Sequence, residues 1–166
     1  MPVLHLLRHA KSSWDEPGLD DHERPLAPRG RRAAKQLARH LEDEGIQPEL
    51  VLCSSARRTV ETYEAIGKAL GEPQVRIEDE LYAASETQLL EQARGVPDGV
   101  GSVMLIGHNP GIQYLAVTLA GSGDELERLR VKYPTAALGT LSFDSTWARL
   151  EPGAAALEAF WRPTKA

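Results

Sequence analysis

The chain has 166 residues, of which 42% are hydrophobic and 26% charged, and this balance predicts one globular domain with a core of its own. Its 19 Lys and Arg residues against 24 Asp and Glu residues give a net charge of −5, which disfavours nucleic-acid binding, because such binding depends on neutralising phosphates. The single Cys53 excludes an internal disulfide and a multi-cysteine metal site. No apolar run approaches the roughly 18 residues of a membrane span, and no signal-peptide pattern is present, so we expect a cytoplasmic protein.

The first half of the chain predicts two strands and two helices around a long loop. In chain order these are a strand over 2–8, a polar loop over 9–27, a helix from Pro28 to a stop at Gly45, a strand over 49–53 and a helix ending at Gly71. A loop of that length inside a compact domain is usually functional.

The second of these helices has an expected cap and an expected buried face. Ser54 or Ser55 can cap its first turn. The helical spacing of its larger side chains predicts that one face packs on the core, formed by Val60, Tyr63, Ile66 and Leu70.

The second half of the chain continues the alternation. It predicts a strand over 74–77, a helix over 86–93, a strand over 102–106, a helix to about Ala120 and a final pair of strands over 137–143 and 156–161. Asn109 is the expected N-cap of the fourth helix and Pro110 its first residue. We therefore predict an α/β fold, a doubly wound three-layer sandwich with a central, mostly parallel sheet, as a single domain over 1–166.

Three of the predicted strands lead into residues that suit phosphate. The first ends in Arg8-His9, the second runs through Ser54-Ser55 into Arg57-Arg58, and the clearest strand ends in the segment 107–111 with His108. Ligands of such sheets bind at the carboxyl ends of strands, and helix N-termini favour anions. We expect a phosphate pocket there, with one of the two adjacent arginines solvated. His5 lies inside an apolar run and is assigned to the core.

Several other chemistries have no support in the sequence. A cysteine phosphatase loop needs Arg at the sixth position after its cysteine, and from Cys53 that position is Thr59. No Walker-type nucleotide loop, no HExxH motif and no cluster of carboxylates occurs, so we expect no cofactor and no metal. A Gly-x-Ser-x-Gly elbow is also absent.

The phosphate-suited segments together resemble a known family. LLRHAKSSW over 6–14, RPLAPRG over 24–30, SSARRTVET over 54–62 and LIGHNPG over 105–111 are similar to the histidine phosphatase superfamily, and most similar to its small SixA-type phosphohistidine phosphatases.

That resemblance implies roles for individual residues. His9 corresponds to the nucleophile, Arg8 and Arg58 to phosphate-binding arginines, and His108 to the second catalytic histidine. Ser54 is the first residue of the motif that contains Arg58. Asn109 is expected to orient its neighbours or cap a helix, and Glu80 in DELYAAS is the nearest candidate for a general acid.

The resemblance also implies the reaction. We expect a metal-independent phosphatase with a covalent phosphohistidine intermediate that acts on phosphohistidine of a signalling or phosphocarrier protein, such as a histidine phosphotransfer domain. The alternatives are a small-molecule phosphomonoesterase of the same superfamily and a non-catalytic phosphate-binding regulator. The partner is accordingly a phosphorylated protein or a small phosphorylated molecule, with no nucleic acid and no membrane, and the protein is expected to be a monomer.

Overall fold

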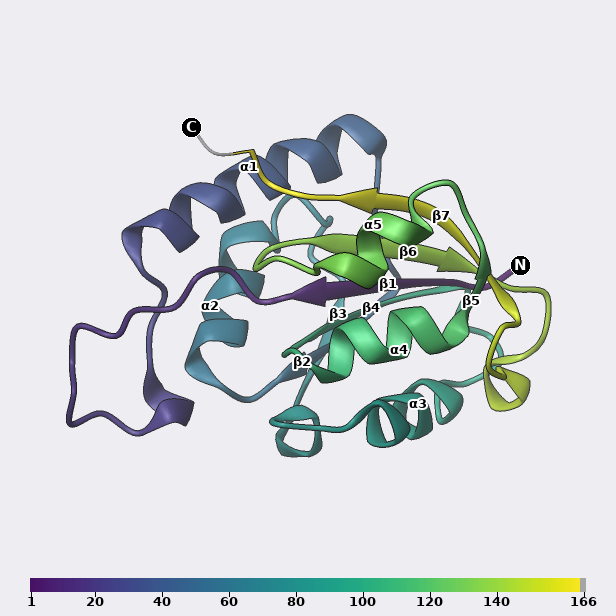
Figure 1. The fold of residues 1–166 in the computed structure, drawn as a ribbon, viewed down its shortest axis with the longest axis horizontal. Helices are drawn as coiled ribbons and strands as arrows, with labels where there is room; N and C mark the ends of the chain where they lie inside the picture. The colour runs from purple at the N-terminus through teal and green to yellow at the C-terminus, as the bar shows by residue number, and fades with distance from the viewer. Residues whose placement is uncertain (165–166) are drawn as a thin grey trace.

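In the computed structural model, which describes residues 1–164, a seven-stranded sheet is covered by helices on both faces (Figure 1). The strands are β1 (Val3–Arg8), β2 (Leu50–Ser54), β3 (Gln74–Glu78), β4 (Ser102–Gly107), β5 (Ala120–Ser122), β6 (Leu138–Ser142) and β7 (Ala155–Trp161). The helices are α1 (Pro28–Glu44), α2 (Arg57–Ile66), α3 (Glu86–Arg94), α4 (Gly111–Leu119) and α5 (Leu126–Val131), and the 3-10 turns are η1 (Asp21–Glu23), η2 (Asp79–Leu81) and η3 (Trp147–Arg149).

The sheet is mostly parallel. Its strand order is β3-β2-β4-β1-β6-β7-β5, and β6 alone among these strands runs antiparallel to its neighbours. The predicted doubly wound α/β class is therefore confirmed, as is the antiparallel pairing of the two last predicted strands. Because β2, β4 and β1 are adjacent and parallel, their carboxyl ends meet at one edge of the sheet.

Alternate residues of the central strand β1 supply the two halves of the core. Leu4 and Leu6 pack in the cluster that includes α3 and α4, whereas Leu7 packs with residues of α1 and α2. Each of these leucines is fully buried, so the strand that leads to Arg8 and His9 is held from both sides.

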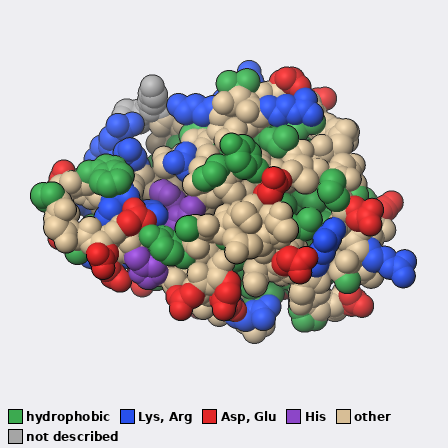
Figure 2. All heavy atoms as spheres, turned by 60° about the horizontal axis from the view of Figure 1, so that its bottom comes forward, with side chains coloured by type: hydrophobic (Ala, Val, Ile, Leu, Met, Phe, Trp, Pro, Cys, Tyr) green, Lys and Arg blue, Asp and Glu red, His purple; other side chains and the backbone are tan. Residues whose placement is uncertain are grey.

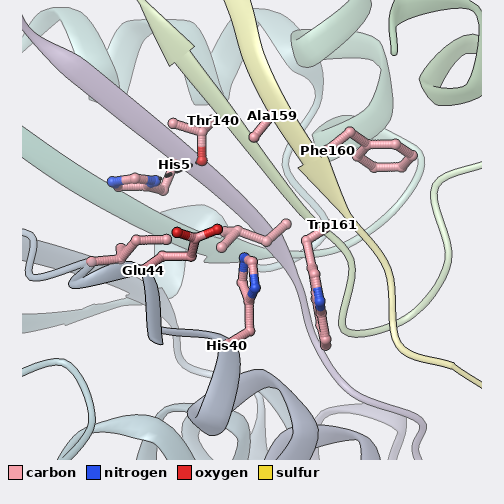
Figure 3. Close-up of a pocket in the computed structure, with 9 residues that line it drawn as sticks. His5, His40, Glu44, Thr140, Ala159, Phe160 and Trp161 are labelled. Carbon is pink, nitrogen blue, oxygen red and sulfur yellow. Dashed lines mark hydrogen bonds between the residues drawn. The ribbon is translucent and has the colours of Figure 1, made fainter. Parts of the chain in front are cut away.

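His5 lies on the same face as Leu7 and is buried, as predicted. Its Nδ1 is 2.9 Å from the hydroxyl of Thr140, and burial lowers the pKa of the ring to about 4. A hollow of about 380 Å³ lies beside His5, between the sheet residues His5 and Thr140 on one side and α1 on the other (Figure 3). On the helix side His40 stacks on Trp161 of β7, with ring centroids 5.0 Å apart. The hollow thus lies on the face of the sheet that α1 covers.

Two predicted helix starts are wrong, whereas the predicted apolar face of the second helix is confirmed, because Ile66 and Leu70 lie in the core and Val60 and Tyr63 pack against it. Helix α2 begins at Arg57, because Ser54 is still part of β2, and the residues it buries are Arg58, Thr59, Thr62 and Ile66. Thr59 and Thr62 can be buried because their hydroxyls donate to backbone carbonyls at 2.7 Å. Helix α4 begins at Gly111, with Pro110 in the cap position.

Strand β5 and helix α5 were not predicted. Both are short, at three and six residues, and neither contains a periodic apolar pattern long enough to separate it from a loop. The predicted stop at Gly45 is confirmed: this residue adopts φ 65°, a left-handed conformation that glycine accepts without strain.

The long loop after β1 is packed closely against α1. A Cβ at Gly30 would lie 2.1 Å from the carbonyl oxygen of Lys11, so only glycine allows this approach. The amide of Ala27 donates to the same carbonyl at 2.9 Å. The loop that follows His9 is therefore held at the helix by its backbone.

Within residues 1–164, no helix combines the length and the apolar character needed to cross a membrane.

Candidate active site

The ends of three neighbouring parallel strands bring the predicted site residues together. Arg8 is the last residue of β1 and His9 follows it, Ser54 is the last residue of β2, and His108 follows β4. The rings of His9 and His108 have centroids 5.2 Å apart. In Figure 2, histidine side chains are visible beside Lys, Arg, Asp and Glu side chains at the end of the molecule that carries the β1–α1 loop.

His9 is held in one tautomer. Its Nδ1 lies 2.6 Å from the carbonyl oxygen of Ala10, and a carbonyl can only accept, so Nδ1 carries the proton. The lone pair is consequently on Nε2. The ring is 7% exposed, and burial is the largest cause that lowers its pKa to about 4, with further lowering by the charges of Arg58 and Arg8. At neutral pH His9 is an uncharged imidazole with a free nitrogen.

His108 is tied to Ser54. The Nε2 of His108 and the hydroxyl of Ser54 are 2.7 Å apart, and Nδ1 of the same ring is buried with no protein partner within the described chain. Burial first, with the positive charges of Arg58 and Arg8 adding to it, lowers the pKa of His108 to about 3. In the empty site this histidine is therefore neutral, and the positive charge comes from the arginines.

Thr62 of α2 also reaches this site. The hydroxyl of Thr62 accepts from the amide of Ala10 at 3.0 Å and donates to the carbonyl of Arg58 at 2.7 Å. Ser54 thus orients one histidine, and Thr62 fixes the backbone next to the other. The segment that runs from β2 into α2 therefore contacts both His108 and the backbone beside His9.

Arg8 is held by a carbonyl that the sequence did not reveal. Its Nη1 donates to the carbonyl of Tyr133 at 2.9 Å, and Nδ2 of the Asn109 side chain donates to the same oxygen at 3.1 Å. The Nε of Arg8 is buried with no partner among residues 1–164. Buried nitrogens without a partner are rare in native proteins, so those of Arg8 and His108 are candidates to bind an anion. The Oδ1 of Asn109 accepts from the amide of Gln113 at 3.3 Å, so this side chain both orients and caps.

The two adjacent arginines of α2 differ in burial and in their bonding partners. Arg58 is 7% exposed, and its guanidinium donates to the carbonyl of Asp21 at 2.7 Å and to its carboxylate at 3.0 Å. Arg57 is exposed and pairs with Glu61 one turn later at 3.1 Å. Of the pair, Arg58 is the residue that lies buried at the candidate site.

Asp21 is a site residue that the sequence reasoning missed. Its carboxylate accepts from the Tyr82 hydroxyl at 2.6 Å, from Arg58 at 3.0 Å and from Arg24 at 2.9 Å. These bonds, that of Tyr82 first, hold the pKa of the carboxyl well below its usual range. Asp21 is therefore ionised and orients two guanidinium groups. Its three-residue separation from Arg24, inside an unusually long loop, was the available signal.

Comparison with known proteins identifies the family of this chain. Residues 4–85 match the family described as the histidine phosphatase superfamily (branch 1). An uncharacterised protein of Mycobacterium tuberculosis is 37% identical over 161 residues, which cover 95% of this chain and 99% of that one. A solved structure from Nakamurella multipartitia, described as a "putative phosphohistidine phosphatase SixA", is 30% identical, covers 99% of this chain and 97% of its own, and superimposes with a TM-score of 0.87. The chain belongs to the histidine phosphatase superfamily.

Within that superfamily it is of the SixA type. A further structure, of the protein histidine phosphatase SixA complexed with tungstate, superimposes with a TM-score of 0.78 over 95% of both chains. At 23% identity that likeness shows the shared fold alone. The SixA type rests instead on the structure from Nakamurella multipartitia, which is 30% identical over nearly the whole of both chains.

In this histidine phosphatase Glu80 stands apart from the other candidate residues. It is exposed on η2 and takes part in no hydrogen bond or ion pair within the described residues, because the turn buries Leu81 and directs its neighbour to solvent. The same stretch reaches the site through Tyr82, whose ring lies 5.6 Å from that of His108, centroid to centroid.

Among residues 1–164 no group of three or more His, Cys, Asp or Glu side chains is arranged to hold a metal ion.

Proposed function

We propose that this histidine phosphatase hydrolyses phosphohistidine on a protein, through a covalent intermediate on His9. The observation that carries the proposal is the bond from Nδ1 of His9 to the Ala10 carbonyl, which leaves Nε2 as a neutral nucleophile beside Arg8 and Arg58. A regulator that only binds phosphate needs no nitrogen prepared in this way.

The reaction has two displacement steps at phosphorus. Nε2 of His9 attacks phosphorus while the bond to the substrate's imidazole breaks, and the departing ring takes a proton from solvent. Water then attacks the same phosphorus, the bond to Nε2 breaks, and phosphate leaves with the water's proton released. Arg8 and Arg58 hold the phosphoryl oxygens in both steps, and His108 donates from Nδ1 when Ser54 donates to its Nε2.

The substrate class follows from what the site lacks within the described chain. A phosphate ester leaves as an alkoxide and depends strongly on a proton donor, whereas imidazole is a better leaving group. Glu80 is exposed and makes no hydrogen bond or ion pair within the described residues, and Asp21 is held ionised. Between α2 and β4 the chain forms only β3, η2 and α3, with no long insertion that could cover the pocket. An uncovered pocket admits a side chain that projects from another protein.

The description of the 30% identical structure from Nakamurella multipartitia as a phosphohistidine phosphatase supports the same substrate class.

The test compares substrates and traps the intermediate. We expect kcat/KM on a histidine phosphotransfer domain, phosphorylated on histidine, to exceed that on any of a panel of small phosphate esters. A phosphoenzyme labile in acid and stable in base should form in the native protein and in the control variant His40→Ala, but not in His9→Ala. A clear preference for a metabolite ester refutes the substrate, and substantial turnover by His9→Ala refutes the covalent route.

A further inference from the structure

Two strongly exposed apolar side chains lie on segments that border the phosphate site. Trp14 is 70% exposed and belongs to the loop that follows His9. Val131 is 83% exposed and stands two residues before Tyr133, whose carbonyl binds Arg8. Exposed apolar groups beside a functional site are a common mark of an interaction surface.

Trp14 is held in place from below. The guanidinium carbon of Arg24 lies 3.3 Å from the centroid of the indole ring, so one face of the ring is covered by a cation. Arg24 itself is 7% exposed and cannot move freely, since it donates to the carbonyl of Ser13 at 3.0 Å, to Asp21 at 2.9 Å and to the hydroxyl of Ser12. The indole is fixed, while most of its surface remains in water.

The backbone around Trp14 is equally well held. The amide of Ser13 donates to the carbonyl of Pro25 at 2.8 Å, and Ser12 pairs with Leu26 in an isolated antiparallel bridge. Because the loop is ordered before any partner arrives, binding through Trp14 carries little entropic cost. Tryptophans in such positions are among the most frequent hot spots of protein interfaces.

Two side chains separate Trp14 from Arg58. Asp21 pairs with Arg58 and with Arg24, and Arg24 lies against Trp14, so Trp14 stands at the rim of a site whose phosphate is bound at Arg58. A protein that presents a phosphorylated side chain to the pocket has surface on either side of that side chain, and this surface reaches the rim.

We propose that Trp14 docks the phosphorylated protein substrate, through an apolar patch that surrounds the substrate's phosphohistidine, and that Val131 is a second and weaker contact. This inference rests on the proposed function, whose substrate is a protein. It makes Trp14 a residue that selects the substrate without touching the reacting phosphorus.

The experiment compares two substrates that carry the same phosphoramidate bond. One is a histidine phosphotransfer domain phosphorylated on histidine, and the other is the free amino acid phosphohistidine. Trp14→Ala is expected to lower kcat/KM on the domain by about tenfold or more, mainly through KM, and to leave kcat/KM on the free amino acid within about twofold. Trp14→Phe should restore most of the loss, and Val131→Ala should cost about threefold on the domain alone.

Tyr114→Ala is the matched control, since Tyr114 is another exposed aromatic residue, 55% exposed on α4, and should affect neither substrate. Equal losses on both substrates by Trp14→Ala would mean that the residue acts through Arg24 on the pocket and would overturn the docking role. No loss on either substrate overturns it as well. If the unaltered protein hydrolyses small esters but not the phosphorylated domain, the proposed function itself fails, and the docking role fails with it.

Discussion

The pH dependence of His9 is a sharp test of the site. Attack on phosphorus requires the neutral ring, and burial, aided by Arg58 and Arg8, lowers its pKa from 6.5 to about 4. Because the pKa is lowered, the nucleophile is present above that value and is lost as the pH falls through it. At pH 5.5 an ordinary imidazole is only about 9% neutral, whereas one with a pKa near 4 is about 97% neutral. Lowering the pH from 7.5 to 5.5 should therefore leave the nucleophile almost unchanged.

The assay is single-turnover formation of the phosphoenzyme between pH 4.5 and 8, corrected for the separately measured ionisation of the substrate. An NMR titration of the His9 ring in the empty protein provides the direct reading. We expect its midpoint well below 6.5, and in Arg58→Gln a midpoint that rises but remains below 6.5, since burial is the larger cause. A midpoint near 6.5 in the unaltered protein would refute the buried, neutral nucleophile.

Three further outcomes are expected. Arg58→Ala should lower kcat/KM by about two orders of magnitude or more and Arg57→Ala by less than about twofold, because Arg58 is buried in the site and Arg57 faces solvent; steady-state kinetics of both variants decide this, and a worse Arg57 variant would contradict it. Asp21→Asn should cost about tenfold to a similar extent for substrates with good and poor leaving groups, since Asp21 orients guanidinium groups; a loss that grows with leaving-group pKa would instead identify it as the acid. Dialysis against EDTA should leave turnover unchanged, because arginines supply the positive charge, and a strict metal requirement would show the charge scheme to be incomplete.

The fold could be predicted where local chemistry and packing agree. The long periodic pattern of α1 ends at a glycine that needs a positive φ, and the apolar strands β1 and β4 are buried from both sides. The pattern was incomplete where burial is polar: besides the apolar face that it predicted, Thr59 and Thr62 are buried through hydroxyl bonds to the backbone, which no hydrophobic period detects. Short α5 gave no signal that outweighs a loop.

The part of the site that lies at the ends of the parallel strands could be predicted from the sequence. Parallel strands carry their last residues to one edge, so the proximity of His9 and His108 follows from the topology. Asp21 and Tyr82 could not be found in this way. Asp21 begins the 3-10 turn η1 and Tyr82 follows the 3-10 turn η2, and only the folded chain brings both to Arg58.

The division of the site between sheet and loop has a consequence for its behaviour in mild denaturant. His9 and His108 adjoin the buried central strands, whereas Trp14 is exposed and belongs to the β1–α1 loop, so we expect the loop to open at a lower urea concentration than the strands. Because Asp21 opens with the loop, hydrolysis of free phosphohistidine should then fall by no more than about the tenfold expected for Asp21→Asn, while hydrolysis of the phosphorylated domain, which also loses Trp14, should fall further. The protein would then pass through a range of conditions in which it keeps its chemistry and loses its choice of substrate.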